Sequence, residues 1–173
     1  MVDHSLKPLL MKLLGFWLAF IALHFAYDFF TSPFLAVFSG TSEAVAQHIK
    51  MSYFAYTFVS LGEYFIRRVE PEYRLQFLDS RLLGVLIVSL ATFLWYIVSA
   101  IRGAGMPTLG LEVIYANAAL LLVGFGTLLI ERDLSATQLS KAGRAAAVIF
   151  FLLLGAILVI GSFRVPWGGF WEM

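Results

Sequence analysis

The chain has 173 residues, of which 61% are apolar and only 13% are charged, and its mean hydropathy is +0.87. A soluble domain is nearer half apolar and a quarter charged, so this composition excludes an ordinary soluble protein and predicts a polytopic membrane protein. The formal net charge of +1, without a clustered basic face, gives no case for a nucleic-acid partner. The chain has no cysteine, which excludes disulfides, Cys-ligated zinc, iron–sulfur clusters and thiol catalysis.

The N-terminal region resembles a signal peptide, because Lys7 and Lys12 precede an apolar run. That run, however, carries His24 and Asp28, and no small-x-small cleavage site follows it. We therefore expect a retained first transmembrane helix, which ends near Pro33 because proline disfavours helix in the residue before it.

Five segments are predicted to span the bilayer as helices. A span needs about 20 mainly apolar residues whose backbone groups bond within the segment. The predicted spans cover about residues 13–31, 43–66, 82–101, 112–130 and 145–163. The fold class is therefore all-α, a bundle of five transmembrane helices forming a single domain over residues 1–173.

The second predicted span is short of apolar residues. Its uncharged core runs only from Met51 to Gly62, and these twelve residues are too short for a hydrocarbon core about 30 Å thick at 1.5 Å per residue. Extension towards Glu63, or back through Lys50 and His48 to a cap at Thr41 or Ser42, brings ionisable groups to membrane depth.

Orientation follows from the lysines and arginines on alternating sides of the five spans. Nine lie on one side and three on the other, which predicts a cytoplasmic N-terminus and an external C-terminus. The nine are Lys7, Lys12, Arg67, Arg68, Arg74, Arg81, Arg132, Lys141 and Arg144; the three are Lys50, Arg102 and Arg164. Trp167, Phe170 and Trp171 would then lie at the outer interface.

Three features between and within the spans carry structural expectations. Residues 34–38 are expected at the membrane interface. Residues 67–81 mix charged and apolar side chains, and we expect a short amphipathic segment on the cytoplasmic surface with its charges solvated or facing lipid phosphates. Gly124 and Gly126 are expected to permit close approach of a neighbouring helix.

The polar residues that remain fall in one layer on the outer side. Ionisable side chains inside a membrane are costly, at about 2.5–3.5 kcal/mol each, and usually face a bundle interior or a wet cavity. We therefore predict an outward-facing pocket that binds a small ligand or ion. Its candidate residues are His24, Asp28, Glu43, His48, Lys50, Glu112 and Asn117.

Each of these residues also has a purely structural interpretation. His24 could hydrogen-bond to a neighbouring helix, and Asp28 and Lys50 could extend to the interface. Glu43 in the first helical turn would be favoured by the helix dipole, and Glu112 would be exposed beside an outer loop. Glu63, near the cytoplasmic end, would pair with Arg67 four residues on.

Three chemistries fit the layer. His24 and His48, with Asp28 or Glu43, have the ligand types of a zinc or non-haem iron site, although their spacing matches no known signature. Two histidines on neighbouring helices could also ligate a b-type haem. A chain of aspartate, histidine and glutamate could relay protons or bind a small cation. We retain a divalent metal ion as the candidate cofactor.

The same stretch resembles a family of small bacterial polytopic membrane proteins known only as a domain of unknown function. Its pattern of His, Tyr, an acidic residue and an aromatic residue matches His24, Tyr27, Asp28 and Phe29, and its later Glu-x-Val-x-x-His-x-Lys pattern matches Glu43, Val45, His48 and Lys50. Ser42, Ala46 and Gln47 depart from that pattern, and its tail is echoed only by Phe163 and Pro166. The resemblance implies a five-span protein of the bacterial cytoplasmic membrane and supplies no activity.

Three functional hypotheses follow. The first is a multi-pass membrane protein that binds a small ligand or ion, with transport as one use of such a site. The second is a metal-dependent intramembrane enzyme that uses His24 and His48. The third is an accessory subunit of a larger membrane complex. Because the chain is small for a complete transporter, we also expect a homo-oligomer.

Overall fold

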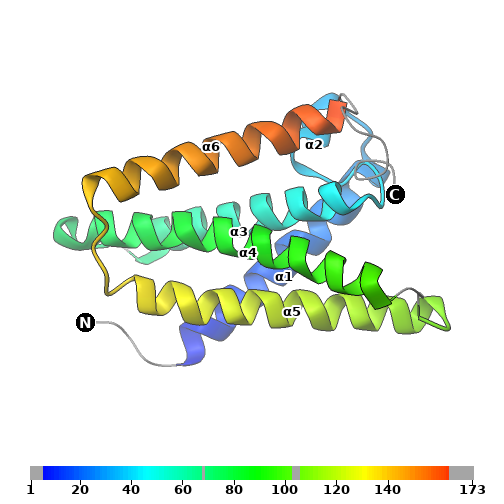
Figure 1. Cartoon of the computed structure of the whole chain (residues 1–173), viewed down its shortest axis with the longest axis horizontal. Coiled ribbons are helices and arrows are strands. Elements are labelled where there is room, and N and C mark those ends of the chain that lie inside the picture. The colour runs from blue at the N-terminus through cyan, green and yellow to red at the C-terminus, as the bar shows by residue number, and fades with distance from the viewer. Residues whose placement is uncertain (1–5, 68, 103–105, 164–173) are drawn as a thin grey trace.

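The computed structural model describes residues 6–67, 69–102 and 106–163, and this part of the chain contains helices and no strand (Figure 1). The all-α prediction is therefore confirmed. The α-helices are α1 (Leu6–Phe29), α2 (Pro33–Phe38), α3 (Val45–Arg67), α4 (Arg74–Arg102), α5 (Leu109–Leu134) and α6 (Lys141–Phe163), and a 3-10 turn, η1 (Pro71–Tyr73), precedes α4.

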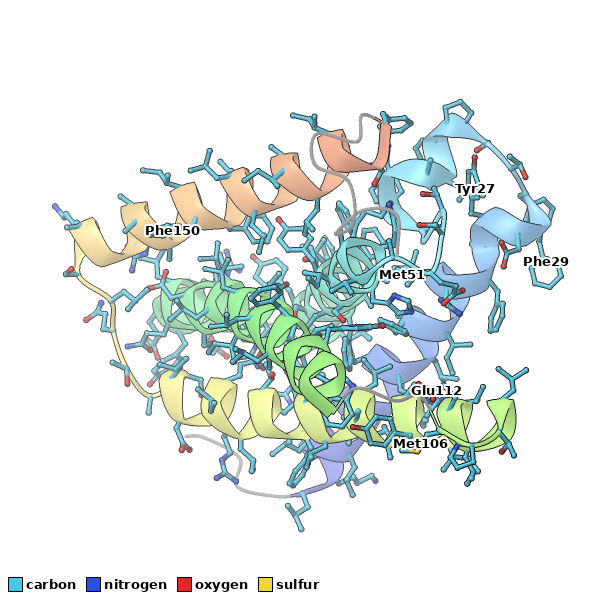
Figure 2. All side chains as sticks on the ribbon, turned by 45° about the vertical axis from the view of Figure 1, so that its right-hand side comes forward. Tyr27, Phe29, Met51, Met106, Glu112 and Phe150 are labelled. Carbon is cyan, nitrogen blue, oxygen red and sulfur yellow. The ribbon has the colours of Figure 1, made fainter. Side chains whose placement is uncertain are left out.

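Four segments of the described chain are long and apolar enough to cross a membrane. They are α1, the segment Pro71–Tyr96 that covers η1 and most of α4, α5 and α6. Many of their large apolar side chains are exposed, for example Phe150 on α6 (Figure 2), as expected where lipid rather than water surrounds a helix. The chain thus has the helices of a multi-pass membrane protein.

The five long helices run alternately in opposite directions, and α1 crosses the others at an angle (Figure 1). We call the end that carries Arg67, Arg74, Arg132 and Lys141 the basic end, and the opposite end, where α1 stops and α3 starts, the histidine end. The predicted interfacial positions of Trp167, Phe170 and Trp171 lie outside the described residues, as do Pro166, Arg68 and Arg164.

α3 is the least apolar of the long helices and the most enclosed. It packs against α1, α4 and α6, and its buried residues include Gln47, Lys50, Ser52 and Ser60. A helix that faces protein on several sides does not need an apolar surface towards lipid. This position explains why α3, at 23 residues, is missing from the four segments that hydropathy identifies.

The connection between α1 and α3, residues 30–44, is longer than the predicted spans imply, and it contains the short helix α2. Ser32 caps α2, with its Oγ accepting from Leu35 N at 3.2 Å, and Pro33 occupies the first turn, where no backbone donor is needed. Gly40 N donates to Leu23 O at 3.3 Å and fastens the connection to α1. The predicted cap at Thr41 or Ser42 and the predicted start of the span at residue 43 are wrong, because α3 begins at Val45.

The expected surface segment over residues 67–81 is not separate from the helices. Residues 74–81 form the first turns of α4. Their charges are not all solvated. Asp79 is buried and accepts two hydrogen bonds from Arg144 at 2.7 and 2.8 Å, and Arg81 binds Glu63. These pairs fasten α4 to α6 and to α3, and so the charges serve helix packing.

Gly124 and Gly126 of α5 differ in what they face. A Cβ built at Gly124 would lie 2.9 Å from Leu13 Cδ1 and from Phe16 Cδ1 of α1, which confirms the predicted close approach. A Cβ at Gly126 would meet no described atom within 4 Å, so the expectation is wrong there. The sequence analysis also missed Gly155 of α6, where a Cβ would lie 2.7 Å from the hydroxyl of Tyr53.

Candidate metal site

Three of the predicted residues converge at the histidine end. The Nε2 atom of His24 lies 3.7 Å from Glu43 Oε1, and the Nε2 atom of His48 lies 3.5 Å from Glu43 Oε2. One ligand atom from each side chain lies within 4.8 Å of the other two. The carboxylate thus bridges two imidazoles that come from different helices.

The helices and the loop between them position this trio. His24 lies on α1 and His48 in the first turn of α3, and their ring centroids are 5.5 Å apart. The prediction that Glu43 lies in the first turn of this helix is wrong. Glu43 lies in the loop before α3, and its side chain is 79% exposed. Gln47 is buried, and its Oε1 accepts a hydrogen bond from Thr41 N at 3.4 Å, which stabilises the loop that carries Glu43.

The hydrogen bond at the other nitrogen of His48 determines which atom is free. Nδ1 lies 3.1 Å from the carbonyl oxygen of Ala44, and because a carbonyl only accepts, Nδ1 must donate. In the neutral ring Nε2 then carries the lone pair, and this is the nitrogen that lies 3.5 Å from Glu43 Oε2. A proton or a metal ion shared by these two atoms would make the contact favourable.

The trio fits a divalent metal ion. Zinc binds imidazole nitrogen and carboxylate oxygen at about 2.0–2.2 Å, which places the ligands of a tetrahedral site about 3–3.5 Å apart. The separations of 3.7 Å to Glu43 Oε1 and 3.5 Å to Glu43 Oε2 are close to that value, and a set of one atom per residue, which extends to 4.8 Å, would have to contract around the ion. The Nδ1 contact of His48 is the outer hydrogen bond that metal-binding histidines usually make. Three protein ligands would leave one position open.

A cavity of about 490 Å³ adjoins the trio. Its walls come from α1, α4 and α5, and most of its lining is apolar or aromatic, including Trp17, Phe20, Trp95, Leu120 and Val123. Tyr96 of α4 packs its ring 5.1 Å from that of His48. Thr92, Trp95 and Tyr96 of α4 also line the cavity, and none of them was among the predicted site residues.

Glu112 and Asn117 line the cavity, as predicted, but both are engaged within the protein. Glu112 Oε2 accepts from Met106 N at 2.6 Å and closes the turn before α5 (Figure 2). Asn117 Oδ1 accepts from Trp17 Nε1 at 2.7 Å, and its Nδ2 donates to Val113 O at 2.8 Å. Their hydrogen bonds indicate structural roles.

Asp28 and Lys50 are not part of the trio. Asp28 is exposed on α1, one turn beyond His24. Lys50 does not extend to the interface but is fully buried, and its Nζ donates to Ala36 O at 2.8 Å and to Ser162 Oγ at 2.7 Å. Lys50 therefore joins α3 to α2 and α6, on the side of α3 away from the cavity.

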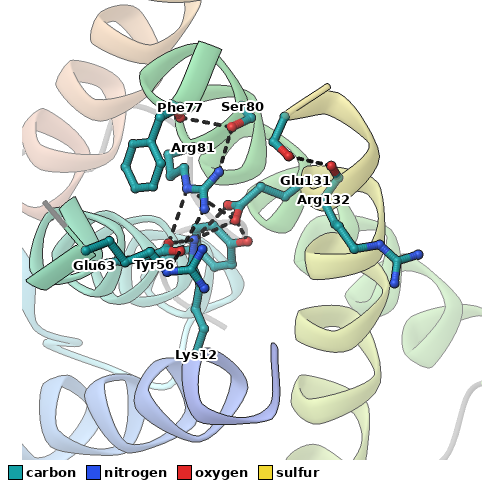
Figure 3. A network of polar contacts seen from close by, with 10 residues as sticks. Lys12, Tyr56, Glu63, Phe77, Ser80, Arg81, Glu131 and Arg132 are labelled. Carbon is teal, nitrogen blue, oxygen red and sulfur yellow. Dashed lines mark hydrogen bonds and ion pairs between the residues drawn. The ribbon is translucent and has the colours of Figure 1, made fainter. Parts of the chain in front are cut away.

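A second polar cluster, which the sequence analysis missed, lies near the basic end (Figure 3). Lys12 of α1 binds Glu131 of α5 at 2.7 Å and Glu63 of α3 at 2.8 Å. Arg81 of α4 donates to Glu63 at 2.7 Å, and the hydroxyl of Tyr56 donates to Glu131 at 2.8 Å. We call these five residues the charge cluster; its two cations balance its two carboxylates and join four helices.

The predicted pair of Glu63 and Arg67 is present at 3.1 Å, but it is the most exposed part of this arrangement. Lys12 and Glu131 each lie one residue outside a predicted span, 13–31 and 112–130 respectively. The sequence places each of them at the end of a helix. Because they are 119 positions apart, no local pattern indicates that their side chains meet. The cluster lines a further cavity of about 500 Å³ that opens at the basic end.

Comparison with protein-family models, curated proteins and solved structures gives no match. The candidate site is therefore defined by its geometry alone.

Proposed function

We propose that this protein is a multi-pass membrane protein that binds a divalent metal ion through His24, Glu43 and His48, in a pocket open to the outer side of the membrane. The observation that carries the proposal is the bridge of Glu43 between two imidazole nitrogens at 3.7 and 3.5 Å. Because Nδ1 of His48 is engaged with a backbone carbonyl, its Nε2 is free to ligate. The fold class and the ligand set are those expected from the sequence.

The outward direction of the pocket follows from the proposed topology. With five crossings and the basic end in the cytoplasm, the trio and its cavity lie in the outer half of the bundle. We propose a bacterial cytoplasmic membrane, in line with the resemblance at His24–Phe29 and Glu43–Lys50. Assembly into a homo-oligomer or a larger complex stays a prediction.

We propose binding, rather than conduction, for the conformation described. Along α1, Phe16 follows the charge cluster and is fully buried, and Val88 of α4 is also fully buried. Both belong to the hydrophobic core cluster. Because this packed layer separates the cavity from the basic end, transport of an ion would require it to open.

One observation supports a second candidate, a metal-dependent intramembrane enzyme. Catalytic zinc sites keep three protein ligands and an open position for water or substrate, and structural sites are closed by four. The trio supplies three ligands beside a cavity large enough for an organic molecule. Among the described residues we identify no general acid or base, and so metal binding is the function that we propose first.

The test is metal binding by the detergent-purified protein, isolated with an affinity tag that contains no histidine. After treatment with a chelator, titration with Zn²⁺ or Co²⁺ should give one ion per chain. His24→Ala and His48→Ala should each weaken binding at least about a hundredfold, since each removes one of three ligands. Gln47→Ala should weaken it about tenfold, because the residue acts only by positioning the loop of Glu43.

His4→Ala removes the remaining histidine of the sequence and is the matched control. It should bind metal as the wild-type protein does. Less than one ion per chain at saturation, or equal affinity in the His24→Ala, His48→Ala and His4→Ala variants, would overturn the proposal.

A further inference from the structure

Resting on the metal site proposed above, we propose that the cavity beside the trio holds the hydrocarbon chain of a single-chain bilayer lipid. The polar head of that lipid would supply an oxygen atom to the open position of the metal. The protein would thus recognise an amphiphilic ligand, with a metal for the head and an apolar cavity for the chain.

The size of the cavity calls for more than an ion. A metal and one or two waters, at about 30 Å³ per water, fill little of a volume of about 490 Å³. Ligand pockets of about 300–1,000 Å³ typically enclose one organic molecule of drug size. One hydrocarbon chain belongs to this range, and a whole two-chain lipid is larger.

The chemistry of the walls selects an apolar occupant. Trp17, Trp95, Leu120 and Val123 line the cavity, and the ring of Phe20 stacks on that of His24 at the end next to the trio. Of the polar wall residues, Asn117 is bonded to Trp17 and Val113. Thr92 Oγ1 lies 3.0 Å from Ser52 Oγ and donates to Val88 O at 2.8 Å. Such a wall has few groups left for a polar ligand, and water gains little there.

The rim of the cavity indicates entry from the bilayer. Its edge is formed by Phe25 of α1 and by Leu109 and Val113 of α5, which are 47, 81 and 52% exposed. A pocket that opens to water usually has a polar rim, and apolar side chains on the outer surface of a transmembrane helix face lipid. A lipid could therefore enter sideways between α1 and α5.

The polar groups lie where the head of such a lipid would rest. His24, His48 and Glu43 border the cavity at its histidine end, with the carboxylate 79% exposed. Glu112 is the other charged group in the lining, and its Oε2 is turned to the backbone of Met106. The metal would offer a vacant bonding position at this end of the cavity, and an oxygen donor on the lipid would complete it.

Bromine-labelled dodecanoate tests the inference in two ways. Bromine at the end of the chain quenches tryptophan fluorescence on contact, so binding should quench Trp17 and Trp95, and the variant Trp17→Phe with Trp95→Phe should lose this quenching. The carboxylate should change the visible spectrum of the Co²⁺-loaded protein. A detergent with a rigid steroid body, used throughout, avoids competition from a detergent chain.

We expect dodecanoate to change the Co²⁺ spectrum at a concentration at least about tenfold lower than acetate, which has the same head and no chain. Ala116→Phe, which fills the cavity from α5, should keep Co²⁺ binding and abolish both responses. Chelation of the metal should weaken quenching by dodecanoate.

The two proposals fail differently. Normal Co²⁺ binding with no advantage of dodecanoate over acetate, or responses unchanged in Ala116→Phe, would overturn the lipid inference and leave the metal site intact. Quenching that is equally strong without metal would overturn the role of the metal in holding the head. Absence of a Co²⁺ spectrum in the protein alone would overturn the metal site and the inference that depends on it.

Discussion

At the scale of single residues, the charge cluster shows how ionisable groups persist inside an apolar bundle. Lys12 is buried on α1, yet its ammonium contacts carboxylates of both Glu131 and Glu63 at 2.7 and 2.8 Å. It also lies 4.8 Å from the ring centroid of Tyr56. Removal of one partner from such a buried pair leaves an uncompensated charge, and this makes the pair sensitive to single substitutions.

We predict that Lys12→Met lowers the free energy of unfolding by about 3–5 kcal/mol, because Glu131 would lose its closest cation. Denaturation of the detergent-purified protein measures the change. Lys7→Met is the matched control, since Lys7 is exposed on the same helix and its loss should be nearly neutral. If both variants unfold alike, the cluster does not stabilise the bundle.

At the scale of elements, the small residues on α5 and α6 determine how close their neighbours come. Gly124 allows α5 to meet α1 at Leu13 and Phe16, where the rings of Phe16 and Tyr56 pack edge to face at 5.5 Å. Without a hydrophobic drive between helices in lipid, such contact depends on van der Waals packing. The position of α1, and with it of His24, therefore depends on the absence of a side chain at Gly124.

We predict that Gly124→Ala destabilises the protein by about 1–3 kcal/mol, because fully buried Phe16 has little room to move. Gly126→Ala on the same helix should be neutral or slightly stabilising, since its Cβ would meet no described atom within 4 Å and alanine favours helix. Thermal unfolding of the two variants in detergent compares them directly. Equal loss of stability in both would contradict this account of the contact between α1 and α5.

At the scale of the whole molecule, the question is whether α3 crosses the membrane. Four other segments qualify by hydropathy, and α3 does not. Its 23 residues are about 34 Å long at 1.5 Å per residue, which is sufficient for the hydrocarbon core. Its polar residues point into the bundle, as Lys50 and Ser52 do, so its low hydropathy reflects burial in protein.

We predict that Thr31 and Glu72, which lie on either side of α3, are on opposite sides of the membrane. The natural chain has no cysteine, so Thr31→Cys and Glu72→Cys each introduce a single thiol at an exposed position. In intact cells a membrane-impermeant maleimide should label Thr31→Cys, and it should label Glu72→Cys only after permeabilisation. Labelling of both in intact cells, or of neither, would contradict a crossing by α3.

Thr137→Cys, in the exposed connection between α5 and α6, is the control for the remaining helices. It should behave as Glu72→Cys does, since α4 and α5 together return the chain to the basic end. Labelling of Thr137→Cys from outside would contradict the proposed orientation.

The sequence by itself determined the fold class, because hydropathy and helix length are local properties that burial in lipid leaves unchanged. It also brought His24, Glu43 and His48 into one candidate set, through their common place near the predicted outer ends of two helices. It could have separated Lys50 from that set. Two residues apart on a helix correspond to about 200°, so His48 and Lys50 must lie on opposite faces.

Only the tertiary structure decided which polar groups meet. The contact of Lys12 with Glu131 spans 119 positions and depends on how α1 crosses α5, which no local pattern encodes. The bridge of Glu43 between two histidines likewise depends on a loop held by Gln47 and on the angle between α1 and α3. A helix sequence specifies the direction of each side chain about its own axis, and packing alone specifies what lies in that direction.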